Sequence, residues 1–134
     1  MGLYQESYEK YTNVTLEVSG GGSGAGASAV INGTASFGML SRDLKGGEID
    51  SGLKATVIAK DGVAVIVGAN AGVTDLTLEQ IAKIFSGEIT NWADIGGTSG
   101  AIAVNIREDG SGTRDCFDTV MKGAYAAYDI PADT

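Results

Sequence analysis

Two short turns rich in glycine and serine carry the residues of this chain that are best suited to chemistry. Residues 20–26 read Gly-Gly-Gly-Ser-Gly-Ala-Gly, and residues 107–114 read Arg-Glu-Asp-Gly-Ser-Gly-Thr-Arg. Each turn lies between a strand-like segment and a helix-like segment. At a helix start, unpaired N–H groups and the positive end of the helix dipole converge, and glycine lets an anion approach the backbone closely. Both turns are therefore candidate cradles for an oxyanion.

The second turn also contains a strong fixed cation, Arg107. A guanidinium can donate two parallel hydrogen bonds to an oxyanion, which a lysine ammonium cannot. Asp109 is well placed to hold that guanidinium in position. Ser111, Gly112 and Thr113 would offer N–H and hydroxyl donors from the first turn of the following helix. Neither turn is a nucleotide phosphate loop, because neither ends in Gly-Lys-Ser/Thr.

Each turn also has a purely structural interpretation. Residues 20–26 could be a flexible Gly/Ser connector. Residues 107–114 could be a salt-bridged loop that ends in a good helix N-cap. Because both turns lie at strand-to-helix junctions, a purely structural role for both of them is less favoured. Their spacing alone does not show that they face one ligand.

Composition excludes several classes of function. The chain has 134 residues, 43% of them apolar and 19% charged, which is a globular composition able to bury a core. Its net charge of −8 argues against a nucleic-acid partner. With no histidine and one cysteine, we expect no zinc site, no metal, no cofactor and no internal disulfide. No nucleophile with a base or metal cage is apparent, so we predict no catalytic residue and no enzyme activity.

The elements that would position the turns alternate between strands and helices. Apolar residues at helical spacing, a Thr77–Gln80 capping box and a stop at Gly87 make residues 77–85 the clearest helix. Alternation of strands and helices predicts an α/β fold in which helices flank a sheet. The expected helices are 3–11, 27–31, 77–85 and the segment after residue 113, and the expected strands are 14–18, 36–40, 57–67 and 101–106.

These residues resemble the periplasmic phosphate-binding protein of the ABC-type phosphate importer, a type II periplasmic binding protein. The segment Gly-Glu-Ile-Thr-Asn-Trp at 87–92 and the Arg107 turn are the most specific parts of the resemblance. The other matching stretches are residues 21–26, 39–42, 59–67, 76–81 and 84–86.

The resemblance implies a two-lobed α/β receptor that closes on inorganic phosphate. Residues 1–67 would belong to the first lobe and residues 68–134 to the second. Asp61 is our candidate for the carboxylate that accepts the proton of phosphate and repels sulfate, although it could simply be a turn residue before Gly62. Many relatives have an Asp where this chain has Arg42, which leaves the identity of that acidic group open. The implied phosphate ligands are Ser23, Gly24, Ser41, Arg42, Asp61, Arg107, Ser111, Gly112 and Thr113, with Asp109 supporting Arg107.

The resemblance covers about half of the usual receptor, which predicts an incomplete two-lobed architecture. Uncovered sheet edges and apolar faces predict a homodimer or higher self-association. The family implies a periplasmic or membrane-anchored extracellular location and the membrane subunits of an ABC importer as partners, although the first residues predict no signal peptide. The alternative is a truncated or repurposed module that keeps the fold, self-associates and binds phosphate weakly or not at all.

Overall fold

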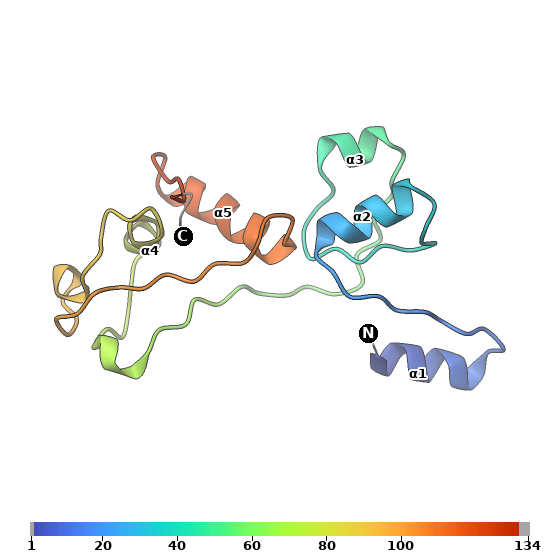
Figure 1. Cartoon of the computed structure of the whole chain (residues 1–134), viewed down its shortest axis with the longest axis horizontal. Helices are drawn as coiled ribbons and strands as arrows, with labels where there is room; N and C mark the ends of the chain where they lie inside the picture. The colour runs from blue at the N-terminus through green and yellow to red at the C-terminus, as the bar shows by residue number, and fades with distance from the viewer. Residues whose placement is uncertain (1, 132–134) are drawn as a thin grey trace.

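The protein is described here by a computed structural model in which residues 2–131 are placed. Two groups of short helices are joined by long extended segments (Figure 1). One group contains α2 and α3, the other contains α4 and α5, and α1 lies apart near the N-terminus (Figure 1). The helices are α1 (Gly2–Tyr11), α2 (Ser23–Ile31), α3 (Gly46–Asp50), α4 (Leu78–Phe85) and α5 (Gly112–Ala124), with 3₁₀ turns η1 (Ala69–Ala71) and η2 (Trp92–Ile95).

Helix α4 forms where its local signals predict. The Thr77 hydroxyl accepts a hydrogen bond from the Gln80 N–H at 3.1 Å, and the Gln80 side chain accepts one from the Thr77 N–H at 2.8 Å. This reciprocal cap satisfies two of the N–H groups that a helix start leaves unpaired. Just beyond the helix end, Gly87 adopts a left-handed conformation with φ of 74°. The predicted helix and its stop are confirmed.

The buried core lies between α4 and α5. Ala82 of α4 contacts a cluster formed by Phe117, Met121 and Tyr128. The rings of Phe85 and Phe117 are 4.6 Å apart between centroids and tilted by 58°, a favourable aromatic geometry. This packing fixes the direction of α5, and therefore the place of its N-terminus.

The predicted strands are extended but are not paired into a sheet. Within residues 2–131, the one β-bridge is the isolated antiparallel pair between Asn91 and Ala101. A strand is stabilised by hydrogen bonds to a neighbouring strand, and these segments have no such neighbour among the described residues. The expectation of a sheet flanked by helices is therefore not confirmed for this chain.

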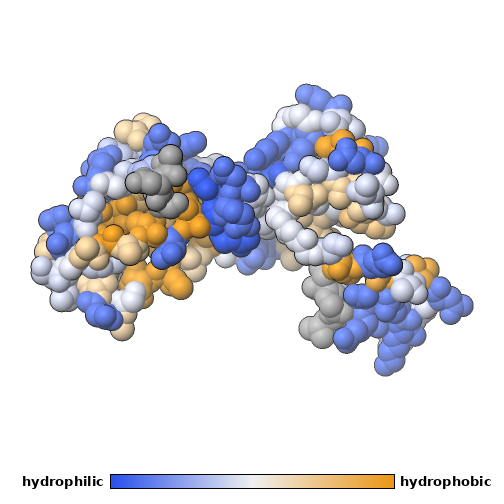
Figure 2. All heavy atoms as spheres, viewed as in Figure 1, coloured by the Kyte–Doolittle hydropathy of each residue, from blue (hydrophilic) through white to orange (hydrophobic). Residues whose placement is uncertain are grey.

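The extended segments leave apolar side chains on the surface. Phe37 is 89% exposed, Ile58 84% and Ile66 90%. Figure 2 shows apolar surface gathered over the group that contains α4 and α5. Monomeric soluble proteins rarely expose so much contiguous apolar surface.

Candidate anion-binding site

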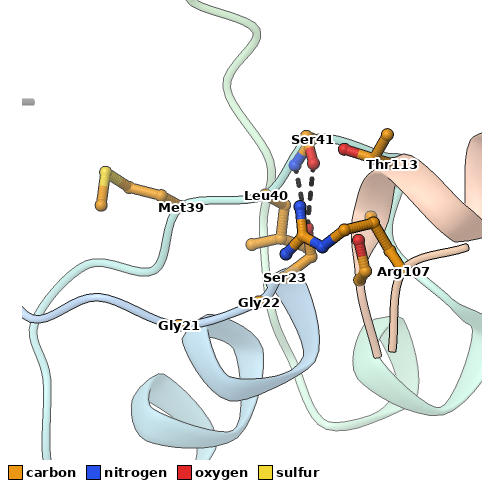
Figure 3. Close-up of a pocket in the computed structure, with 10 residues that line it drawn as sticks. Gly21, Gly22, Ser23, Met39, Leu40, Ser41, Arg107 and Thr113 are labelled. Carbon is orange, nitrogen blue, oxygen red and sulfur yellow. Dashed lines mark hydrogen bonds between the residues drawn. The ribbon is translucent and has the colours of Figure 1, made fainter. Parts of the chain in front are cut away.

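A cavity of about 280 Å³ lies where the N-terminus of α2 meets the N-terminus of α5 (Figure 3). Its walls come from both glycine-serine turns and from the segment that precedes α3. Two helix N-termini at one cavity supply N–H groups and positive dipole ends to the same space. The lining residues are Gly21, Gly22, Ser23, Met39, Leu40, Ser41, Arg107, Ser111, Gly112 and Thr113.

Close backbone contact holds the two turns together. The Gly24 N–H donates a hydrogen bond to the Gly110 carbonyl at 3.1 Å. A Cβ added at Gly22 would lie 2.9 Å from the same carbonyl oxygen, and a Cβ added at Gly112 would overlap the hydroxyl oxygens of Ser23 and Ser41. Glycine is therefore required at these positions because a side chain would push the two walls apart.

Three serines contribute hydroxyl groups at the cavity. The Ser41 N–H donates to the Ser23 Oγ at 3.0 Å, and the two hydroxyl oxygens are 3.3 Å apart. Ser23 is 5% exposed and Ser111 is 2% exposed. Ser111 also caps α5, since its Oγ accepts a hydrogen bond from the Arg114 N–H at 3.4 Å. Ser23 and Ser111 each accept a backbone N–H. One of the two hydroxyls in the Ser23–Ser41 contact must donate to the other, which leaves the second of them and the Ser111 hydroxyl able to donate to a ligand.

Arg107 lines the same cavity from the second turn, and Figure 3 shows its side chain extended toward the two serines of the first wall. Its guanidinium is bound by Glu108, with Nε–Oε2 at 2.8 Å and Nη2–Oε1 at 2.7 Å. This pairing raises the pKa of Arg107 and lowers the pKa of Glu108 to about 2. The side chain is 57% exposed, so a ligand can reach the part of the guanidinium that Glu108 does not contact.

The carboxylate that braces Arg107 in the structure is Glu108, whereas the sequence suggested Asp109. Arg114 explains the difference, because its side chain folds back over the turn. Arg114 Nη1 donates to the Arg107 carbonyl at 3.0 Å and lies 3.1 Å from Asp109 Oδ1. Asp109 is therefore paired with Arg114.

Arg42 is next to the cavity but does not line it. Its guanidinium donates to both carboxylate oxygens of Glu48, at 2.9 and 2.8 Å, and its Nε lies 2.8 Å from Asp115 Oδ2. The hydrogen bond from Arg42 is the main reason that the pKa of Glu48 falls to about 2. The charge of Arg42 is balanced by these two carboxylates, and its side chain is not among those that line the cavity.

Asp61 and Gly24 also lie differently from the predicted arrangement. Asp61 is exposed, does not line the cavity, and uses Oδ1 to accept a hydrogen bond from the Gly62 N–H at 2.8 Å. That is the turn role left open for it on sequence grounds. The N–H of Gly24 is occupied by Gly110. Four residues that were not predicted also line the cavity: Gly21, Gly22, Met39 and Leu40. Their closeness in sequence to Ser23 and Ser41 was the feature of the sequence that could have predicted them.

Comparison with known proteins places this arrangement in a family. Residues 2–131 match the family model described as the PBP superfamily domain. The chain belongs to the PBP superfamily. The recognition made from the turn motifs is confirmed.

Sequence relatives of this PBP domain are phosphate-binding proteins. It is 41% identical over 96 residues to phosphate-binding protein PstS 2 of Streptococcus agalactiae, which covers 71% of this chain and 33% of that protein. It is 35% identical over 133 residues to phosphate-binding protein PstS of Bacillus subtilis, covering 94% of this chain and 43% of that protein. The chain thus spans less than half the length of these curated relatives.

A solved structure matches nearly the whole PBP domain. This crystal structure from Clostridium perfringens is described as a phosphate ABC transporter substrate-binding protein with bound phosphate. The match has a TM-score of 0.89 and 42% identity, and it covers 99% of this chain and 54% of that one. The extended segments and helices of this chain therefore have the arrangement of a periplasmic-binding-protein-like fold.

Two further features of this PBP domain bear on its chemistry. In the part of the chain that the structure describes, no three His, Cys, Asp or Glu residues are grouped to hold a metal ion. Over the same residues, none of the helices has the length and apolar character needed to cross a membrane.

Proposed function

We propose that this chain binds inorganic phosphate as part of the substrate-binding receptor of an ABC phosphate importer. The observation that carries the proposal is the single cavity in which both glycine-serine turns and Arg107 meet. The names of the relatives and the phosphate in the Clostridium perfringens structure support phosphate as the ligand.

The cavity has the chemistry of a tetrahedral oxyanion site. Hydroxyl groups of Ser23, Ser41 and Thr113 can donate to phosphate oxygens, and Arg107 can donate two parallel hydrogen bonds. None of the described residues that line the cavity is acidic, and the nearby Glu108 carboxylate is paired with Arg107. The local field can therefore favour an anion even though the whole chain carries a net charge of −8.

Calorimetric titration with phosphate, sulfate and an organic phosphate ester tests this function. We expect saturable heat with phosphate, and absence of such heat would overturn the proposal. Arg107→Ala should abolish the heat because it removes the fixed cation that lines the cavity. Lys54→Ala is the matched control, since it removes one positive charge from an exposed position outside the cavity lining.

The receptor role implies binding without chemistry on the ligand. We propose residues 1–67 as the first-lobe segment and residues 68–134 as the second, although Met1 and residues 132–134 lie outside the described part of the chain. The partners would be the membrane subunits of the importer, and the location would be periplasmic or extracellular. Release of inorganic phosphate from the organic ester in the same titration would contradict a non-enzymatic role.

The exposed apolar residues support a second candidate, a repurposed module that keeps the fold, self-associates and binds phosphate weakly or not at all. The unpaired extended segments carry exposed apolar residues such as Ile58 and Ile66. A second copy can cover such segments by pairing strands or exchanging elements. Light scattering at micromolar concentration distinguishes the cases: a mass above that of one chain, together with no phosphate heat, supports this module, and a strictly monomeric mass contradicts it.

A further inference from the structure

A cluster of four charged residues lies directly beside the cavity. Arg42 is at its centre, with a side chain that is only 7% exposed. One side of the guanidinium binds the Glu48 carboxylate, and its Nε lies 2.8 Å from Asp115 Oδ2. Lys45 Nζ lies 3.0 Å from the same Asp115 oxygen. Two cations and two carboxylates thus balance one another in the cluster.

This cluster joins two walls of the cavity that are far apart in sequence. Arg42 directly follows Ser41, which lines the first wall. Asp115 lies in the first turn of α5, two residues after Thr113, which lines the second wall. Figure 3 shows Ser41 and Thr113 next to each other at the top of the cavity. Each residue of the Arg42–Asp115 ion pair is therefore within two positions in sequence of a residue that lines the cavity.

Asp115 faces the one guanidinium nitrogen of Arg42 that Glu48 does not bind. Arg42 Nε is buried and has no hydrogen-bond partner among the described residues, so the nearby Asp115 carboxylate is what balances the charge at that atom. A buried charge that loses its partner is strongly destabilised, whereas an exposed ion pair contributes little. Glu48 and the Asp43 carbonyl bind the other edge of the guanidinium, and Nε faces Asp115 of α5.

Resting on the proposed phosphate-binding function, we infer that the Arg42–Asp115 ion pair is a clamp that positions Ser41 against the N-terminus of α5. Arg42 is then a positioning residue and does not touch the ligand. The clamp keeps Ser41 and Thr113 within one cavity, so phosphate meets both walls without first drawing them together. Loss of the clamp lets the walls separate. Phosphate must then draw them together, and the free energy of that step weakens binding.

Two measurements on the full chain test the clamp. The first is phosphate affinity by calorimetry. The second is the distance between α3 and α5 by pulsed electron paramagnetic resonance, with spin labels on Cys116 and on an introduced Asp50→Cys. Cys116 is the single cysteine of the chain and is exposed, and Asp50 is an exposed residue at the end of α3. The labels therefore report directly on the two elements that the cluster joins.

Asp115→Asn is the main variant. We expect it to broaden the distance distribution and to weaken phosphate binding at least tenfold, with added phosphate narrowing the distribution again. Asp115→Glu keeps the charge and should restore both the distance and the affinity to within about threefold of the unmodified chain, a pattern expected of preorganisation. Asp43→Asn is the matched control, because it removes a neighbouring carboxylate whose side chain is exposed and outside the cluster.

The outcomes separate the clamp from its alternatives. Unchanged distance and affinity in Asp115→Asn would overturn the clamp. Arg42→Lys that loses phosphate binding at an unchanged distance would make Arg42 a direct ligand, which also overturns it. Circular dichroism shows whether Asp115→Asn folds. If it does not, the affinity and distance measurements on Asp115→Glu and Arg42→Lys test the clamp in its place. A chain that binds no phosphate but shows the expected distance changes would retain the clamp and reject the proposed function.

Discussion

Gly112→Ala should open the cavity from its most crowded point. A Cβ at this position would overlap the hydroxyl oxygens of both Ser23 and Ser41, which come from the opposite wall. Forcing an added methyl group into a packed site costs about 1–3 kcal/mol. Since a factor of ten in affinity corresponds to about 1.4 kcal/mol, we expect phosphate to bind about 5- to 150-fold more weakly.

Gly123→Ala supplies a control within the same helix. Gly123 also belongs to α5, but a Cβ there would meet no atom within 4 Å. Alanine is favoured over glycine in a helix interior by up to about 1 kcal/mol, so this variant should be slightly more stable and bind phosphate normally. Calorimetry and thermal unfolding of both variants provide the assay. Normal phosphate affinity in Gly112→Ala would refute the contact between the two walls as the basis of the site.

Three further predictions concern single residues at or near the cavity. Arg107→Lys should weaken phosphate binding by about 1.5–3 kcal/mol in calorimetry, because lysine lacks the paired donors of a guanidinium; affinity equal to that of the unmodified chain would exclude a two-point contact. Ser111→Ala should lower the stability in chemical unfolding by about 0.5–2 kcal/mol, because it removes the N-cap of α5, and an unchanged midpoint would show that the cap contributes nothing. The pKa of Glu48 is lowered to about 2 from 4.5 by Arg42, so its stabilising contribution is present above pH 4.5 and is lost as pH falls toward 2. Glu48→Gln should therefore lower the melting temperature at pH 7 and reduce its fall between pH 4.5 and 2, whereas parallel pH profiles would contradict the ion pair.

Local signals made α4 predictable in full. Its cap, its apolar face and its stop all lie within eleven consecutive residues, 77–87, and each acts through neighbours in sequence. The strands were not predictable in the same way. Apolar alternation shows that residues 57–67 favour extended backbone, but a strand in a sheet also needs a hydrogen-bonded neighbour, and none is present among the described residues.

The roles of charged residues were the least predictable part of the site. Arg42, Asp61 and Asp109 all had suitable chemistry and positions near the motifs. Arg42 reaches across the fold to Asp115, whereas Asp109 pairs with Arg114 of the same turn and Asp61 accepts a hydrogen bond from the adjacent Gly62. The sequence does not show the Arg42–Asp115 contact, because it depends on which elements are packed together, and in the second turn it does not show which acidic residue each arginine pairs with.

The sequence by itself determined the chemistry of the two turns. Glycine allows the close backbone approach of residues 22 and 112, serine supplies hydroxyl donors, and Arg107 supplies the cation, all as properties of residue type. Only the tertiary structure decided that the turns share one cavity and that Arg42 belongs to its support. The reason is that packing of α5 on α4, together with the contact of Gly24 with Gly110, brings the N-terminus of α5 to that of α2.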